Sequence, residues 1–249
     1  MAGHSKWANI KHRKAKVDAK KGAAFAKYSR EIIVAAKSGG ADPEANFRLR
    51  TAIDKAKAAG LPNDNIKRAI EKAAGAGAGD NFEVINYEGY GPGGVAVLIQ
   101  VMTDNRNRTA GDIRSYFNKY NGNLGETGCV GWMFKEEGVI SVDKKGIDQE
   151  KLFDQAINAG AEDFNSDDEE YRIITTPDTL QEVAENIEKE GYKLNNVEIA
   201  RNPQNTVAVE DAETAKQLIR LLDCIENHND VQNVYANFEI DDKLLEEIS

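Results

Sequence analysis

The segment AAGAGAGDNFEVINYEGYGPGGVAVLIQVMT, residues 73–103, marks the point where the sequence pattern changes from helices to strands. Its first part has no large side chain and is rich in glycine, so we expect a linker at residues 75–80. Two apolar runs follow at residues 82–87 and 95–102, separated by the glycines of residues 89–94. This pattern predicts a β-hairpin rather than a phosphate-binding loop, because a strand follows the glycines where such a loop requires a helix.

Three short helices are predicted before the linker. Apolar residues recur at helical spacing over residues 18–38, again between Asp42 and Gly60, and again over residues 63–73. Asp42 followed by Pro43 has the order of an N-cap and a first helical residue, and Asn63 is suited to cap the third helix. We therefore expect a small helical domain at residues 23–74, preceded by an arm at residues 1–22.

After the hairpin, a helix is predicted at residues 106–120, and residues 138–200 then alternate as strand, helix, strand, strand, helix, strand. That order is the ferredoxin-like βαββαβ motif. The last strand, helix and strand cannot bury both faces alone, so we expect them to complete the unit begun by the hairpin. The predicted fold class is α+β: a three-helix domain, then a discontinuous α/β domain (81–134 plus 202–240) interrupted by an inserted ferredoxin-like domain (135–201), with 132–135 and 201–204 crossing between them.

Composition excludes several classes of protein. The chain has 249 residues, 41% of them hydrophobic, and no apolar run long enough to span a bilayer. Its basic N-terminus is not followed by the apolar stretch of a signal peptide, so we expect a cytoplasmic protein without membrane contact. Cys129 and Cys224 are too few for a disulfide framework or a CxxC metal site, and we expect both to be reduced core residues.

Charge is distributed very unevenly along the chain. The net charge is −10, yet residues 1–72 hold 17 basic and 7 acidic side chains, while residues 73–249 hold 15 and 35. The arm alone interleaves seven Lys or Arg with two His and one Trp: His4, Lys6, Trp7, Lys11, His12, Arg13, Lys14, Lys16, Lys20 and Lys21. Cations for phosphates and an indole for stacking are typical of nucleic-acid binding. The alternative is a solvated tail with Trp7 packed against the helices.

A second basic cluster, TDNRNRT at residues 103–109, joins a strand to a helix. Asp104 or Asn105 can cap that helix, but Arg106 and Arg108 fall in its first turn, where each cation opposes the helix dipole by roughly 0.3 to 1 kcal/mol. A phosphate bound at the helix N-terminus would justify them. The alternative is an arginine pair bridged to nearby acids such as Glu83 or Glu88.

No catalytic or metal site is legible. The three histidines, His4, His12 and His228, do not form a metal triad or a Ser-His-Asp arrangement by spacing, and the acidic run at residues 163–170 lacks EF-hand spacing. We therefore expect no enzyme, no cofactor and no small-molecule substrate.

Five stretches of the sequence resemble the YebC/PmpR family of transcriptional regulators and mitochondrial translational activators. They are GHSKWANIKHRKAKVDAKKG (3–22), REI (30–32), KSGGADPEANFRLRTAIDKAKAAGLPNDNIKRAI (37–70), YEGYGPGGVAV (87–97) and TDNRNRT (103–109). Mild departures, such as Cys129 in place of a serine and Trp132 in place of Tyr or Phe, touch no charged position. The resemblance implies a cytoplasmic, non-enzymatic protein that binds promoter DNA or acts on ribosomes.

Three functions are compatible with the sequence. The first is a DNA-binding transcriptional regulator, because a basic helical domain suits duplex phosphate; the protein would act as a monomer. The second is a translation factor that contacts ribosomal RNA and tRNA. The third is a protein scaffold whose basic arm binds an acidic partner and no nucleic acid.

Overall fold

The computed structural model describes residues 19–75, 82–166, 169–241 and 243–244. Its N-terminal part consists of three helices, α2 (Ala19–Gly39), α3 (Phe47–Ala58) and α4 (Asn63–Ala74). They enclose a small core that includes Ile32, Leu49 and Ala56, each of which is fully buried. The helical spacing of apolar residues thus predicted the three helices correctly.

The helix starts differ from the predicted ones. Helix α3 begins at Phe47 and is capped by Asn46, whose side chain accepts a hydrogen bond from the Leu49 amide. Asp42 instead accepts from the Glu44 amide in the preceding turn, so it closes that turn rather than the helix. Asn63 is the first residue of α4, whose N-cap position is occupied by Pro62 without a side-chain hydrogen bond. Short polar residues favour turns and caps alike, which is why spacing alone misassigned both caps.

The β-hairpin is formed by β1 (Glu83–Gly91) and β2 (Val95–Thr103), joined by a 3-10 turn at Pro92–Gly94. Gly93 and Gly94 have φ angles of 76° and 74°, which side chains other than glycine rarely adopt. Helix α5 (Arg106–Lys119) and the two-residue strand β3 (Asn123–Leu124) follow. The predicted hairpin and helix are therefore confirmed.

The C-terminal elements complete the sheet begun by the hairpin, as expected. They are β8 (Val207–Ala208), α8 (Ala212–Glu226), β9 (Val231–Ala236) and β10 (Phe238–Glu239). The main sheet has the order β3-β1-β2-β9, and β8 and β10 form a separate parallel pair. One core joins alternate residues of β2, such as Val97 and Ile99, to Ile113 of α5 and Leu218 of α8.

The inserted unit has ferredoxin-like topology. It contains β4 (Phe134–Asp143), α6 (Gln149–Ala159), β5 (Asp163–Ser166), β6 (Glu170–Thr175), α7 (Leu180–Lys189) and β7 (Leu194–Pro203). Its sheet has the order β5-β6-β4-β7 with antiparallel neighbours throughout, and its core lies between this sheet and the two helices. The predicted fold class is thus confirmed. The segments expected to cross between the domains, 132–135 and 201–204, are not separate strands. Residues 134–135 are the start of β4 and residues 201–203 are the end of β7, and the two strands form one long ribbon in which Phe134 pairs with Pro203.

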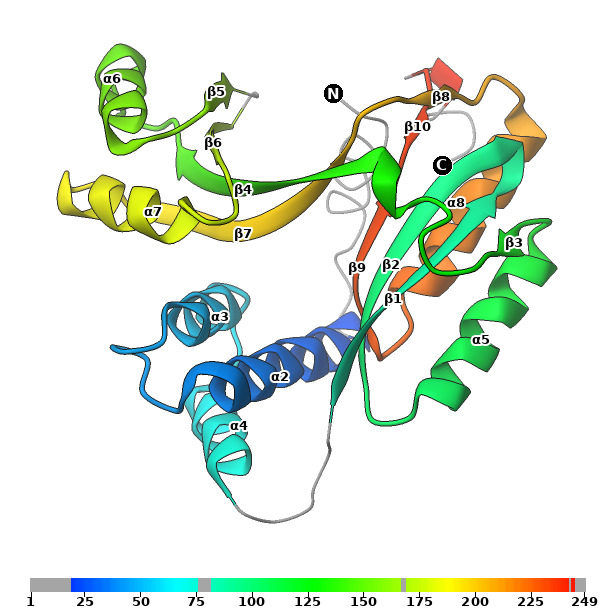
Figure 1. Ribbon diagram of the computed structural model, residues 1–249, viewed down its shortest axis with the longest axis horizontal. Helices are drawn as coiled ribbons and strands as arrows, with labels where there is room; N and C mark the ends of the chain where they lie inside the picture. Colours follow the sequence, from blue (N-terminus) through cyan, green and yellow to red (C-terminus); the bar gives the residue numbers. More distant parts are fainter. Residues whose placement is uncertain (1–18, 76–81, 167–168, 242, 245–249) are drawn as a thin grey trace.

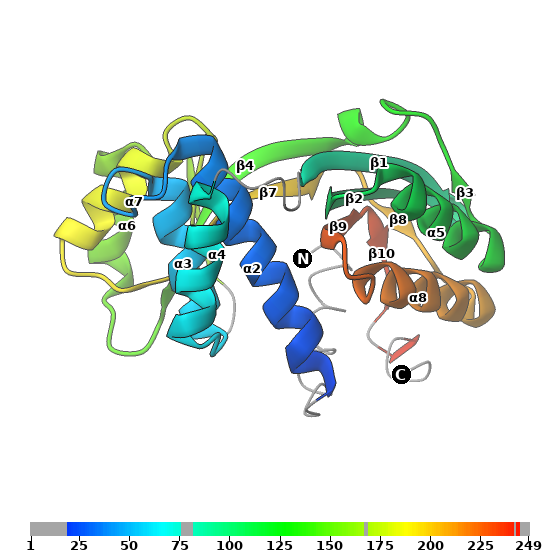
Figure 2. The same ribbon diagram turned by 90° about the horizontal axis from the view of Figure 1, so that it is seen from below.

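Figure 1 shows that ribbon running from the inserted unit to the main sheet, while α5 and α8 cover the far face of the main sheet. The helical part lies beneath the ribbon, and α2 reaches from it toward β9, as Figure 2 also shows. Helix α3 contacts the inserted unit through the ion pairs Arg50–Glu185 and Lys55–Glu198, each 3.2 Å long. Phe47, the first residue of α3, packs against the core of the inserted unit.

Two further expectations concern cysteines and membranes. Cys129 and Cys224 are free thiols, as expected, but both are half-buried rather than enclosed in a core. In the part of the chain that the structure describes, no helix combines the length and the apolar character needed to cross a bilayer.

Candidate nucleic-acid interface

The TDNRNRT segment forms the junction between β2 and α5, and its polar side chains organise the start of that helix. Asn105 is the N-cap: its side-chain oxygen accepts a hydrogen bond of 3.1 Å from the Arg108 amide. Thr103 supports the cap, because its hydroxyl accepts a hydrogen bond of 3.0 Å from the Asn105 amide. Arg106 and Arg108 therefore lie in the first turn of α5, where the sequence predicted them.

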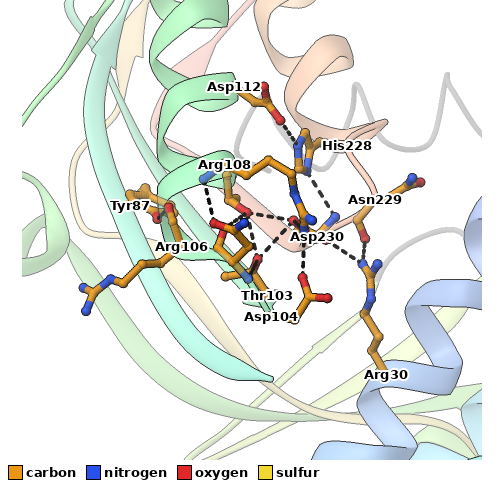
Figure 3. A network of polar contacts seen from close by, with 12 residues as sticks. Arg30, Tyr87, Thr103, Asp104, Arg106, Arg108, Asp112, His228, Asn229 and Asp230 are labelled. Carbon is orange, nitrogen blue, oxygen red and sulfur yellow. Dashed lines mark hydrogen bonds and ion pairs between the residues drawn. The ribbon is translucent and has the colours of Figure 1, made fainter. Parts of the chain in front are cut away.

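Arg108 is held by two carboxylates. Its Nη2 atom lies 2.9 Å from Asp104 Oδ1 and 2.8 Å from Asp230 Oδ2, and its side chain remains 48% exposed (Figure 3). The expected alternative of an arginine bridged to acids is therefore found for Arg108, but with Asp104 and Asp230 as the acids. Glu88, one of the two acids suggested from the sequence, instead accepts three backbone hydrogen bonds on the other side of the sheet.

Asp230 lies in the turn between α8 and β9, and its carboxylate is the centre of these contacts. Its side chain is only 3% exposed, and it accepts hydrogen bonds from the hydroxyls of Thr103 (3.2 Å) and Thr109 (2.7 Å). Its other oxygen lies 3.1 Å from Nη1 of Arg30, a residue of α2 (Figure 3). One buried carboxylate thus joins the helical part of the chain to the first turn of α5. We call Arg30, Thr103, Arg108, Thr109 and Asp230 the Asp230 junction.

The charge on Asp230 is stabilised by its partners. Burial alone would raise the pKa of this carboxyl, but hydrogen bonds from Arg108 and Thr109 and the nearby charge of Arg30 outweigh burial and hold the pKa below the usual 3.8. The same contacts act on the cation: hydrogen bonds to Asp230 and Asp104 raise the pKa of Arg108. Both partners are therefore ionised at neutral pH.

His228 fixes the backbone of the turn that carries Asp230. The Asp230 amide donates to His228 Nδ1 over 3.1 Å, so Nδ1 acts as an acceptor and the ring proton resides on Nε2. Nε2 then donates to Asp112 of α5, also over 3.1 Å. His228 is thus a structural link between the turn and α5.

Arg106 differs from Arg108 in its surroundings. Its carbonyl accepts a hydrogen bond of 3.1 Å from the Tyr87 hydroxyl, while its guanidinium points away from the junction (Figure 3). The residue is exposed. Of the two predicted arginines, Arg106 is therefore the one whose cation is presented outward.

Helix α2 is anchored to the same turn by further contacts. Lys27 donates to the carbonyl of Glu226, and Arg30 donates to the carbonyl of Asn229. The guanidinium of Arg30 also lies 5.4 Å from the centre of the Phe82 ring. These contacts attach α2 to the end of α8 and to the turn between α8 and β9. Helix α2 is also the element that follows the basic arm in the sequence.

Most of the predicted arm lies outside the described residues. These are His4, Lys6, Trp7, Lys11, His12, Arg13, Lys14 and Lys16. Lys20 and Lys21 lie in the first turn of α2, and nothing is described of their side chains. The helical part adds exposed cations that were not among the predicted site residues, such as Arg48, Lys57, Lys67 and Arg68.

Arg30, Asp230 and His228 also contribute to this site, but they were not among the site residues predicted from the sequence. Asp230 is 122 residues from Arg108 along the chain, so no local pattern could pair them.

Within the described ranges, no group of three or more His, Cys, Asp or Glu side chains is arranged so that it could hold a metal ion.

Comparison with known proteins decides the family. The model of the TACO1/YebC N-terminal domain matches residues 5–76, and the model of the TACO1/YebC second and third domain matches residues 82–238. The chain belongs to the TACO1/YebC family. This confirms the resemblance noted in the sequence.

Members of the TACO1/YebC family resemble the chain over its whole length. A probable transcriptional regulatory protein of Natranaerobius thermophilus is 56% identical over 99% of both chains, and one of Persephonella marina is 54% identical over 100% of both. The crystal structure of a conserved hypothetical protein from Aquifex aeolicus, 50% identical, superposes with a TM-score of 0.83 and covers 92% of this chain and 94% of that one.

Proposed function

We propose that this TACO1/YebC protein is a nucleic-acid-binding regulator of gene expression, and that duplex DNA is its target. Its binding surface would comprise the basic arm, the exposed cations of the helical part and the first turn of α5. Binding would go mainly to phosphates, because these elements offer many cations. The proposal is for a binding protein and not for an enzyme.

The Asp230 junction is the observation that carries the proposal. The arm continues into α2, and Arg30 of α2 shares the Asp230 carboxylate with Arg108 of α5. Helix α2, which follows the arm in the sequence, and the first turn of α5 are therefore linked within one contact network, although they belong to different parts of the fold. Arg106, on the same first turn, presents its cation outward beside the N-terminus of α5 (Figure 3). Such a terminus attracts phosphate through its free N–H groups and its dipole.

Charge and family support the same proposal. The first 72 residues carry 17 basic and 7 acidic side chains, and the remainder is strongly acidic, so the field of the protein steers the N-terminal end toward polyanions. The relatives in Natranaerobius and Persephonella are both named probable transcriptional regulatory proteins. A regulator of transcription would act through promoter DNA.

The test compares two targets at one salt concentration. Full-length protein is titrated into fluorescent duplex DNA, and in parallel it is centrifuged with ribosomes through a sucrose cushion. The proposal predicts DNA binding that weakens steeply with salt and little protein in the ribosome pellet. Co-sedimentation without DNA binding would overturn the choice of DNA in favour of the ribosome. Failure to bind either target would indicate a scaffold.

A further inference from the structure

The side of helix α5 that faces away from the main sheet carries polar and basic residues. Ile113 and Phe117, on the other side of the helix, are buried in the core of the main sheet. Figure 1 shows α5 at the outside of the molecule, where no other labelled element lies beyond it. We call the exposed residues at helical spacing on this outward side the α5 outer face: Asn107, Gly111, Arg114, Ser115, Asn118 and Lys119.

The side chains of the α5 outer face are free to bind a partner. Asn107, Arg114 and Asn118 form no hydrogen bond or ion pair with any residue that the structure describes. The Lys119 ammonium lies 5.2 Å from the centre of the neighbouring Tyr120 ring. Asp112, the one acidic residue of α5, lies toward α8 and accepts a hydrogen bond from His228. The outward side of the helix is therefore basic and polar.

Gly111 lies in the middle of the α5 outer face, and no contact within the described residues requires a glycine there. A Cβ atom at this position would have no neighbour within 4 Å. Glycine destabilises the interior of a helix relative to alanine, so this residue lowers the stability of α5 without a gain in packing. Glycine does allow another molecule to approach the helix backbone closely. The position therefore indicates a docking face.

The local charge of α5 suits a polyanion, although the chain after residue 72 is acidic overall. Of the 35 acidic residues in 73–249, 18 belong to the inserted unit, 134–203, whose helices lie at the opposite end of the molecule from α5 (Figure 1). Helix α5 holds four basic residues and one acidic residue. The neighbouring helix α8 adds two exposed cations, Lys216 and Arg220. The α5 outer face is thus a basic surface within the acidic part of the chain.

The composition of the α5 outer face favours duplex DNA over other partners. Among the described residues, the exposed large apolar side chains lie on elements other than α5 and α8, so the face lacks the apolar anchors of a protein interface. Its six residues include no aromatic ring on which an unpaired base would stack. Arginine and asparagine are the side chains that form paired hydrogen bonds with guanine and adenine in the major groove, which is about 12 Å wide and admits an α-helix.

We propose that the α5 outer face enters the major groove of duplex DNA and reads bases there. This proposal rests on duplex DNA binding as the proposed function and adds recognition of sequence to the phosphate contacts. Arg114 pairs with guanine, and Asn107 and Asn118 pair with adenine. Gly111 lets the helix approach the bases, and Lys119 binds a flanking phosphate.

The first experiment adds bulk to the α5 outer face without removing a charge. Full-length protein and its Gly111→Leu variant are titrated into one fluorescent duplex of about two helical turns, roughly 20 base pairs, which the full-length protein has selected from a random pool. Leucine favours a helix and its Cβ meets no neighbour, so the melting temperature should stay the same or rise. Asn158→Leu, at an exposed position of α6, is the matched control.

We expect Gly111→Leu to weaken duplex binding at least about tenfold, because the added side chain holds the helix away from the bases. Asn158→Leu should bind as the wild type does. If Gly111→Leu also binds as tightly as the wild type, α5 does not dock on the duplex and the proposal is refuted, while the proposed function stands. If the full-length protein binds no duplex, the proposed function fails and base reading by α5 fails with it.

The second experiment separates bases from phosphates. Arg114→Lys keeps the charge but loses the paired hydrogen bonds, and Asn118→Ala removes no charge, so both variants should keep the salt dependence of binding. Each variant selects duplexes from the same random pool. We expect each to lose, at one base pair, a preference of roughly 5- to 150-fold that the wild type shows. A wild type without any sequence preference, or variants that retain its full preference, would overturn base reading by α5.

Discussion

The Asp230 carboxylate is buried, and hydrogen bonds and ion pairs from four side chains compensate for its lost hydration. Two are arginines from different parts of the fold, Arg30 and Arg108, and two are threonine hydroxyls. A buried charge loses its hydration, and only short, well-aligned hydrogen bonds restore that loss. Replacing Asp230 therefore affects the helical part and α5 together.

The depressed pKa of Asp230 makes a pH-dependent prediction. Asp230→Asn should lower the free energy of unfolding at pH 7 by about 1.5 to 3 kcal/mol, because hydrogen bonds to a charged group are lost. Since the folded pKa lies below the usual 3.8, the advantage of the wild type is fully present above that value and disappears as pH falls through the folded pKa. Urea unfolding from pH 7 down to about 2.5 measures this difference. A difference that persists unchanged at the lowest pH would contradict it.

Arg106 and Arg108 form a matched pair in one helical turn, and they should separate binding from stability. Arg108→Ala leaves buried Asp230 with one arginine fewer and should lower the free energy of unfolding by about 1 to 3 kcal/mol. Arg106→Ala should change it by less than about 0.5 kcal/mol, since the side chain is exposed. Arg106→Ala should nevertheless weaken DNA binding and reduce the salt slope by about one. Thermal melting and DNA titration of both variants check this, and equal melting temperatures would contradict it.

At the scale of single elements, α3 depends on the residue that begins it. Asn46 caps α3 through its oxygen and donates through its amide to the carbonyls of Ala35 (2.9 Å) and Gly40 (2.7 Å). Asn46→Ala should cost about 1 to 2 kcal/mol, whereas Asn46→Asp keeps the cap but loses both donated bonds. Chemical denaturation of the two variants measures the separate contributions. An alanine variant as stable as the wild type would exclude this cap.

Glu88 is expected to control the segment that carries Trp132. Glu88→Gln places an amide where three backbone N–H groups need an acceptor, so the variant should lose about 1 to 3 kcal/mol. The amides of Gly128, Val130 and Gly131 should then exchange faster with deuterium. Glu126→Gln, in the same segment but exposed, serves as the control and should behave as the wild type. Unchanged exchange in Glu88→Gln would show that the segment is held by packing alone.

The elements differ in how well the sequence predicts them. The order of helices and strands follows from apolar periodicity, because each element must bury one face. The ferredoxin-like unit and the hairpin were predictable for that reason. The caps at Asn46 and Pro62 were not, because Asp42 and Asn63 satisfy the same local rules equally well. Sequence placed Arg106 and Arg108 at the start of α5, but the different environments of the two depend on Asp230, which only tertiary folding brings near.

At the scale of the whole molecule, the separation of charge is the dominant feature. The N-terminal 72 residues are strongly basic, and the rest of the chain carries 35 acidic side chains. The acidic part would be repelled by a polyanion and the basic part attracted, so the protein should bind in one orientation. Salt should weaken this binding, because each phosphate contact releases a condensed counterion.

The central claim is that the basic arm binds nucleic acid, and the salt dependence of DNA binding tests it most directly. It is measured for the full chain and for a variant that lacks Ala2–Asp18 and therefore keeps all residues of α2. The deleted stretch contains five Lys or Arg. For the full chain, about six neutralised phosphates predict a log-log slope of affinity against salt near −5, and the slope becomes shallower by about one for each phosphate that is no longer neutralised. We predict that the deletion variant remains folded, binds duplex DNA much more weakly and shows a far shallower slope. A variant that binds as tightly as the full chain, with the same slope at matched salt, would contradict a nucleic-acid interface built on the basic arm.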